Sequence, residues 1–164
     1  MIRKALTVLF RIVALLAVLA FSAAGLVTVA DIVGRRIGEG IPGVVDIVQL
    51  FTLGGAWMAI AYAFWTKAHV RVDLVILSAP ERIARGFRLL SFLLSFGLMA
   101  IMLPPAIGAF ENQLAYGDRS QQLGLPIAWY WLPVLVGLAL SILAIALRSL
   151  ARKDPPRSGD GSHV

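Results

Sequence analysis

Few residues of this chain have side chains suited to acid–base, metal or redox chemistry. Its 164 residues include no cysteine, which excludes a cysteine nucleophile and a thiolate metal site. The two histidines are His69 and His163, and neither lies within an apolar stretch. One chain therefore cannot place two facing imidazoles on a haem or a metal ion inside a bilayer. This pattern predicts that the chain is not an enzyme and holds no cofactor.

Polar and charged residues gather instead at three places along the sequence. These are Asp31, Arg35, Arg36 and Asp46; then His69, Arg71 and Asp73; and finally residues 111–122. On a helix, the four-residue spacing of Asp31 and Arg35 would bring their side chains together. In an extended stretch, the alternate positions of the second cluster would project to one side. Two interpretations stay open: the clusters fix loops or contact a partner, or they make ordinary solvated contacts with lipid headgroups.

The sequence also contains four apolar stretches, and the polar clusters lie at the ends of these stretches or in the segments between them. The chain is 59% hydrophobic with a mean hydropathy of +0.85, whereas soluble domains are about 45–50% apolar. Spans are predicted at about residues 6–30, 44–65, 86–110 and 126–147. Away from the helix ends these spans contain no Asp, Glu, Lys or His, the residues that usually mark ion pathways in membranes. A solute pathway within this chain alone is therefore not expected.

The predicted fold class is all-α, an integral membrane protein with four transmembrane helices. Residues 1–152 form the predicted membrane domain, and residues 153–164 are predicted to be a disordered cytoplasmic tail. The alternative for the first stretch is a signal peptide, because Arg3 and Lys4 precede it and small residues follow its core. Since the apolar run continues past those small residues to Ala30, a membrane span is favoured.

The third stretch is too long to lie wholly within a bilayer. From Ala79 to Phe110 it would measure about 48 Å as a helix, against a hydrocarbon core of about 30 Å. Ser78 and Glu81 have the spacing of a capping box, which predicts a helix start there. Beyond it, basic and apolar residues occupy different sides of the helix, with Arg82, Arg85 and Arg88 on one side and Ile83, Phe87 and Leu90 on another. This pattern predicts an amphipathic interface segment before the third span.

The distribution of Lys and Arg predicts the orientation. Twelve of the 15 basic residues fall on one side of the membrane in the four-span arrangement, and Arg35, Arg36 and Arg119 fall on the other. Because basic residues are retained on the cytoplasmic side, both termini and the middle loop are predicted to be cytoplasmic, in a bacterial inner membrane. The same bias accounts for the net charge of +6, so no nucleic-acid partner is expected.

Small residues recur at helical spacing inside three of the spans. They are Ala20, Ala24 and Thr28, then Gly55, Ala59 and Ala63, and finally Gly137 and Ser141. Such residues let helix backbones approach closely. Packing among the four helices and packing against an external partner explain these positions equally well.

Three separated stretches resemble a known family. They are Asp31-Ile-Val-Gly34-Arg35 with Ile41-Pro42-Gly43 and Asp46; His69-Val-Arg71-Val-Asp73 followed by Pro80; and Gly117, Ser120, Leu123, Pro126, Tyr130 and Pro133. Together they resemble the small membrane subunit, of DctQ type, of tripartite ATP-independent periplasmic (TRAP) transporters. Two departures from the family pattern are Asp46, where Glu is more usual, and Arg36, where an aromatic residue is common.

The resemblance implies a small permease subunit that braces a large membrane permease subunit during sodium-driven uptake of an organic acid. A periplasmic solute-binding protein would deliver the acid, and the lipid bilayer would surround both membrane subunits. The residues expected to contact a partner or fix loops are Asp31, Arg35, Pro42, Asp46, His69, Arg71, Asp73 and Tyr130. Two alternatives are the small subunit of another tripartite carboxylate transporter and the membrane anchor of a redox complex.

Overall fold

Four long helices make up most of the described chain. The computed structural model describes residues 2–66 and 81–150. The helices are α1 (Ile2–Arg36), α2 (Val44–Thr66), α4 (Glu81–Tyr116) and α5 (Ala128–Leu150). Each is long and apolar enough to cross a membrane, and the described residues contain no strand beyond one isolated bridge between Arg119 and Pro126. The predicted all-α membrane fold with four spanning helices is confirmed.

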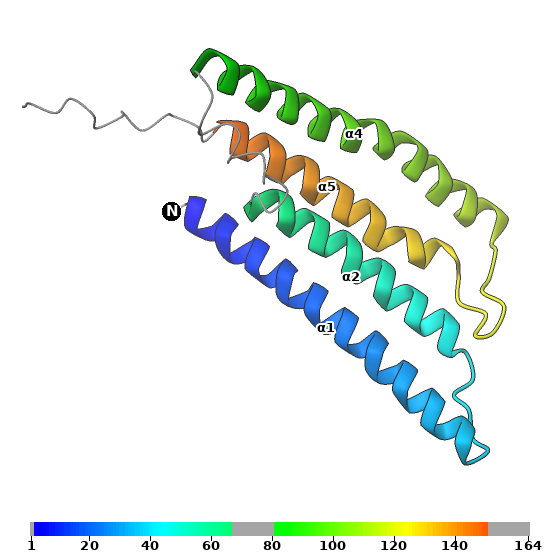
Figure 1. The fold of residues 1–164 in the computed structure, drawn as a ribbon. Coiled ribbons are helices and arrows are strands. Elements are labelled where there is room, and N and C mark those ends of the chain that lie inside the picture. The colour runs from blue at the N-terminus through cyan, green and yellow to red at the C-terminus, as the bar shows by residue number, and fades with distance from the viewer. Residues whose placement is uncertain (1, 67–80, 151–164) are drawn as a thin grey trace, which may run out of the picture.

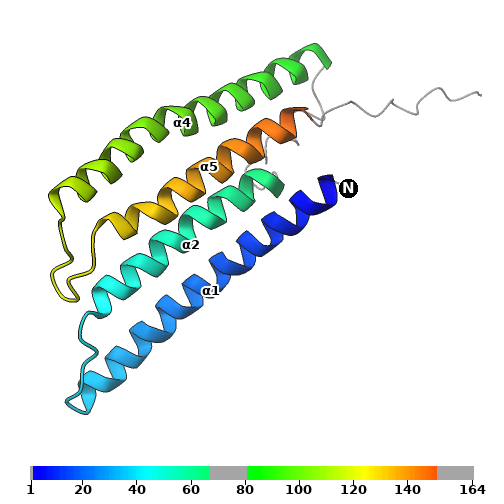
Figure 2. The same cartoon turned by 180° about the vertical axis from the view of Figure 1, so that it is seen from behind.

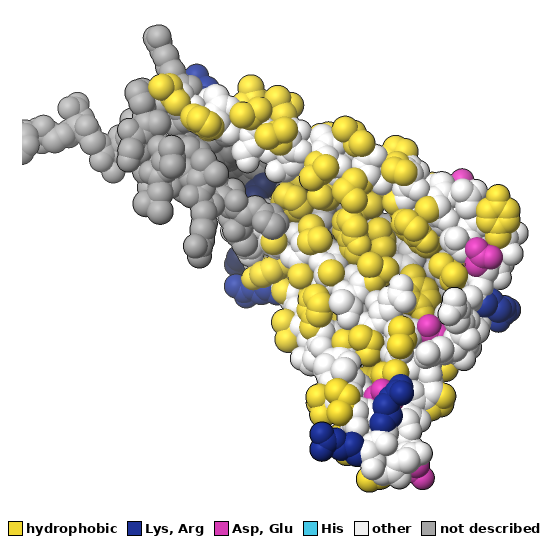
Figure 3. Space-filling view, turned by 45° about the vertical axis from the view of Figure 1, so that its right-hand side comes forward, with side chains coloured by type: hydrophobic (Ala, Val, Ile, Leu, Met, Phe, Trp, Pro, Cys, Tyr) yellow, Lys and Arg dark blue, Asp and Glu magenta, His cyan; other side chains and the backbone are white. Residues whose placement is uncertain are grey.

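The four helices lie side by side in one layer, in the order α1, α2, α5, α4 (Figures 1 and 2). The inner helices α2 and α5 pack against each other, and each outer helix packs along one of them. Much of the apolar surface therefore stays open: Leu26, Ile101 and Leu94 are all more than three-fifths exposed. In Figure 3, hydrophobic side chains cover the middle of one face, with charged side chains toward its ends. Such a surface is stable in lipid, because acyl chains solvate it as well as another helix would.

Two clusters of buried side chains hold the layer together. One joins α4 to α5 through Met99, Ala106, Val134, Leu138 and Ile145. The other joins α1, α2 and α5 through Phe10, Val13, Ala61 and Ala144. In the second cluster the Phe10 ring stacks on Trp65, with centroids 4.6 Å apart and an angle of 8° between planes. The layer thus has side-chain packing at each of its three helix contacts.

Glycine allows the closest helix approaches. A Cβ atom added at Gly137 of α5 would lie 2.5 Å from Cβ of Trp57 on α2 and 2.9 Å from its backbone carbonyl carbon. A Cβ at Gly55 of α2 would lie 3.3 Å from the carbonyl oxygen of Ala17 on α1. At these two positions, the small residues serve packing among the protein's own helices.

The helices extend beyond the predicted spans. α1 continues to Arg36, and it passes without a break through the small residues at positions 22–24. α4 is one helix of 36 residues, about 54 Å long, and joins the predicted interface segment to the third span. Ser78, the predicted helix cap, and the tail at 153–164 lie outside the described residues.

Candidate functional site

The α1–α2 turn and the α4–α5 loop lie at the same end of the layer (Figure 1). Two carboxylates in this region, Asp31 and Asp46, are 7% and 6% exposed. A buried carboxylate is stable only when hydrogen bonds or charges replace its lost water. The partners of each carboxylate therefore show what holds this end together.

Asp31 fastens the α1–α2 turn back onto the end of α1. Its carboxylate accepts a hydrogen bond from Nε of Arg35 at 2.7 Å, the ion pair that the four-residue spacing predicted. The second carboxylate oxygen accepts the backbone N–H of Ile41 at 2.8 Å. This second bond could not be predicted from the sequence spacing, and it fixes the turn just before Pro42. The Pro42 side chain itself is exposed.

The end of α1 has a compact hydrogen-bonded turn. The carbonyl oxygen of Gly34 accepts backbone N–H groups from Ile37 at 3.1 Å and from Glu39 at 2.8 Å. A Cβ atom at Gly34 would collide with the carbonyl oxygen of Glu39, so the close approach requires glycine. The chain therefore reverses direction in a tight turn between α1 and α2.

Asp46 links the start of α2 to the α4–α5 loop. Its carboxylate accepts the backbone N–H of Leu123 at 2.8 Å and that of Gln122 at 3.3 Å, and Ser120 is a further hydrogen-bonding partner. A carboxylate in the first turn of a helix is also favoured by the helix dipole. Next to it, Gly43 adopts φ 75°, and the Leu123 side chain fills the space that a Cβ of Gly43 would need.

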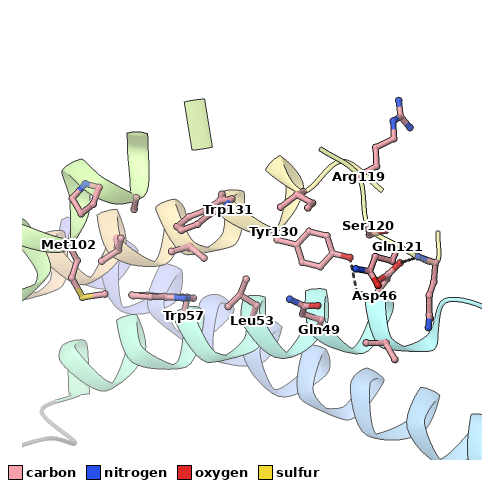
Figure 4. A pocket seen from close by; sticks show the side chains of 17 residues that line it. Asp46, Gln49, Leu53, Trp57, Met102, Arg119, Ser120, Gln121, Tyr130 and Trp131 are labelled. Atoms are coloured by element: carbon pink, nitrogen blue, oxygen red, sulfur yellow. Dashed lines mark hydrogen bonds between the residues drawn. The ribbon is translucent and has the colours of Figure 1, made fainter. Parts of the chain in front are cut away.

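Tyr130 adds a second link between α5 and α2. The side chain is buried, with 6% exposed, and its hydroxyl donates to the backbone carbonyl of Asp46 at 3.2 Å (Figure 4). The loop before it is bonded to itself: Ser120 N–H donates to the Leu125 carbonyl at 2.8 Å, and Ser120 Oγ accepts the Leu125 N–H at 3.0 Å. Asp46 and Tyr130, both selected from the sequence, are thus in contact although they are 84 residues apart in the chain.

A cleft of about 780 Å³ opens beside these links. It lies over α5 between α2 and α4, and its loop end has the polar residues Asp46, Gln49, Ser120 and Gln122. Farther in, its walls are apolar and come from three helices, with Leu53 and Trp57 on α2, Met102 and Ala106 on α4, and Val134 and Leu138 on α5 (Figure 4). Sequence reasoning missed this cleft because its walls come from helices that are distant in the sequence.

The remaining predicted site residues, His69, Arg71 and Asp73, lie outside the described residues. Their assignment to a partner contact or a loop-fixing role stays a prediction. Within the described ranges, no three His, Asp or Glu side chains come together as a metal site.

Comparison with known families gives a match over most of the chain. The family described as the DctQ component of tripartite ATP-independent periplasmic transporters matches residues 24–154. The chain belongs to the DctQ family. The matched range contains the end of α1, all of α2, α4 and α5, and both buried carboxylates. No curated protein and no solved structure gives a significant match.

DctQ proteins are components of transporters, not an enzyme family. This DctQ chain is accordingly a multi-pass membrane protein, and its family implies association with a large membrane subunit and a binding protein. The Asp31 and Asp46 links lie at one end of its helix layer, where the cleft begins, and all of the residues that form them fall within the matched range.

Proposed function

We propose that this chain is the small permease subunit of a sodium-driven TRAP transporter. It braces the large permease subunit while that subunit takes up an organic acid delivered by a periplasmic solute-binding protein. The observation that supports this role is the open single layer of four helices, tied across one end by two buried carboxylates. Its place is the bacterial inner membrane, with both termini in the cytoplasm.

A brace needs a large contact with lipid and little internal motion, and the layer supplies both. A flat row of four helices presents more surface to the bilayer than a compact bundle of the same helices. Asp31 prevents the α1–α2 turn from moving relative to α1, and Asp46 joins α2 to the loop before α5. The middle of each described span has no Asp, Glu, Lys or His, so the large subunit supplies the groups that bind solute and ion.

The two alternatives receive less support. A membrane anchor of a redox complex needs paired haem ligands or polar groups at depth, and the chain has only His69 and His163 as imidazoles. The small subunit of another tripartite carboxylate system has a similar span count, but the family match is to the DctQ component.

Reconstitution tests the proposed function. The chain is co-expressed with a large subunit and a binding protein from the same organism, purified in mild detergent and placed in liposomes. We expect the large subunit to co-purify, and we expect solute uptake only with a sodium gradient, the binding protein and this chain all present. Equal uptake by liposomes that lack only this chain would contradict the bracing role. A visible absorbance band from the purified chain would favour the redox anchor.

Reporter fusions test the orientation. We expect a reporter active in the cytoplasm to work when fused after Ser78 or Val164, and a reporter active in the periplasm to work after Gly40 or Gly117. The reason is the twelve-to-three division of basic residues between the two sides. Periplasmic activity at Ser78 would show that the middle loop is on the other side and that the charge argument is wrong.

A further inference from the structure

The cleft over α5 has the polarity profile of one membrane leaflet. Its charged and amide side chains are confined to the loop end, and its lining on α2 is apolar at Leu53 and Trp57. From Asp46 to Trp57, α2 advances about 16 Å, close to half of a hydrocarbon core of about 30 Å. On the facing wall, Ile127, which directly precedes α5, and Leu138 of α5 are also eleven residues apart and cover a similar depth. The cleft thus begins at the polar loops and ends near the bilayer midplane.

The apolar part of the cleft has an uneven wall that includes Trp57, Met102 and Leu138. Flexible acyl chains can follow such a wall, because they have no fixed shape and solvate apolar side chains as well as another helix does.

The loop end offers a cation to a phosphate group. Arg119 lines the cleft, and its guanidinium donates one hydrogen bond, from Nη1 to the Gly124 carbonyl at 3.1 Å. In Figure 4 this side chain extends from the loop away from Asp46. The Asp46 carboxylate is buried and accepts the Leu123 and Gln122 amides, and among the described residues it forms no ion pair with Arg119. A guanidinium with spare N–H groups suits a phosphodiester oxygen.

We propose that this cleft binds one phospholipid from the leaflet that borders the α1–α2 and α4–α5 loops. The phosphate lies at Arg119, and the acyl chains lie along Trp57, Met102 and Leu138. The lipid fills the space between α2 and α4, both of which pack on α5.

Native mass spectrometry of the purified full chain tests this site. After repeated detergent washing, we expect one phospholipid to remain on the wild-type chain. Arg119→Glu is expected to lower its occupancy about tenfold by replacing attraction with repulsion, while Arg36→Glu, the same charge change at the end of α1, leaves it unchanged. Arg119→Lys, which keeps the charge, is expected to retain most of the lipid.

A second variant blocks the apolar part without touching the loop. Met102 is 37% exposed and lines the cleft, so Met102→Trp fills the channel, whereas Leu98→Trp on the same helix is a matched control at an exposed position that does not line it. We expect only Met102→Trp to displace the lipid. Equal lipid occupancy in both variants, or a wild-type chain without retained phospholipid, would overturn the proposal. A photoreactive residue at position 102 that crosslinks the large subunit instead of lipid in the intact complex would also overturn it.

Discussion

Gly137→Leu is expected to break the contact between α2 and α5, with the largest loss of stability among the variants considered. Even the first added carbon would lie 2.5 Å from Cβ of Trp57 and 2.9 Å from its backbone carbonyl carbon and oxygen. Backbone atoms cannot rotate aside, so the two helices must separate. This contact is the middle one of the layer, and its loss leaves α1 with α2 and α4 with α5 as two pairs.

Overpacking of a tight contact costs about 1–3 kcal/mol and occasionally more, and leucine adds further bulk beyond the first carbon. The measurement is the midpoint of thermal unfolding of the purified chain in detergent, together with its yield. Gly108→Leu is the matched control, because a Cβ there meets no heavy atom within 4 Å. Gly137→Ala should give a smaller loss than Gly137→Leu. Equal midpoints for the variants at 137 and 108 would contradict the close approach of α2 and α5.

Asp46→Ala is expected to release the α4–α5 loop from the start of α2. The variant removes the acceptor of the Leu123 and Gln122 N–H groups and a partner of Ser120, and a methyl group replaces none of these bonds. Hydrogen exchange at the two amides should speed up on the order of tenfold, because their bonded state is lost while the helices remain. We also expect less of the large subunit to co-purify, since the loop no longer has a fixed position.

Three substitutions make this test specific. Asp118→Ala, in the same loop, removes an exposed carboxylate and should leave the exchange rates near wild type. Asp46→Glu keeps a carboxylate acceptor, so it should preserve most of the protection. Asp46→Asn keeps one oxygen acceptor and should give an intermediate result. If Asp46→Ala and Asp118→Ala exchange at the same rate, the buried carboxylate does not hold the loop.

The sequence alone determined the elements and part of their chemistry. Long apolar stretches bounded by charge can form only spanning helices, because backbone groups in lipid must be satisfied within the segment. The Asp31–Arg35 ion pair followed from helical spacing, since residues four apart lie on one face. Asp46 and Tyr130 were selected individually from a family resemblance, but nothing in their spacing showed that they meet.

Tertiary structure alone decided the order α1, α2, α5, α4 and everything that depends on it. Apolar helix faces in lipid do not specify a neighbour, because acyl chains solvate leucine as well as another helix does. Steric fit chooses among the pairings: Gly137 admits the backbone of Trp57, and Gly55 admits that of Ala17. The bond from Leu123 to Asp46 joins residues 77 apart, and the cleft exists only because α2 and α4 both pack on α5. These features arise from contacts between distant segments, which local periodicity and composition do not encode.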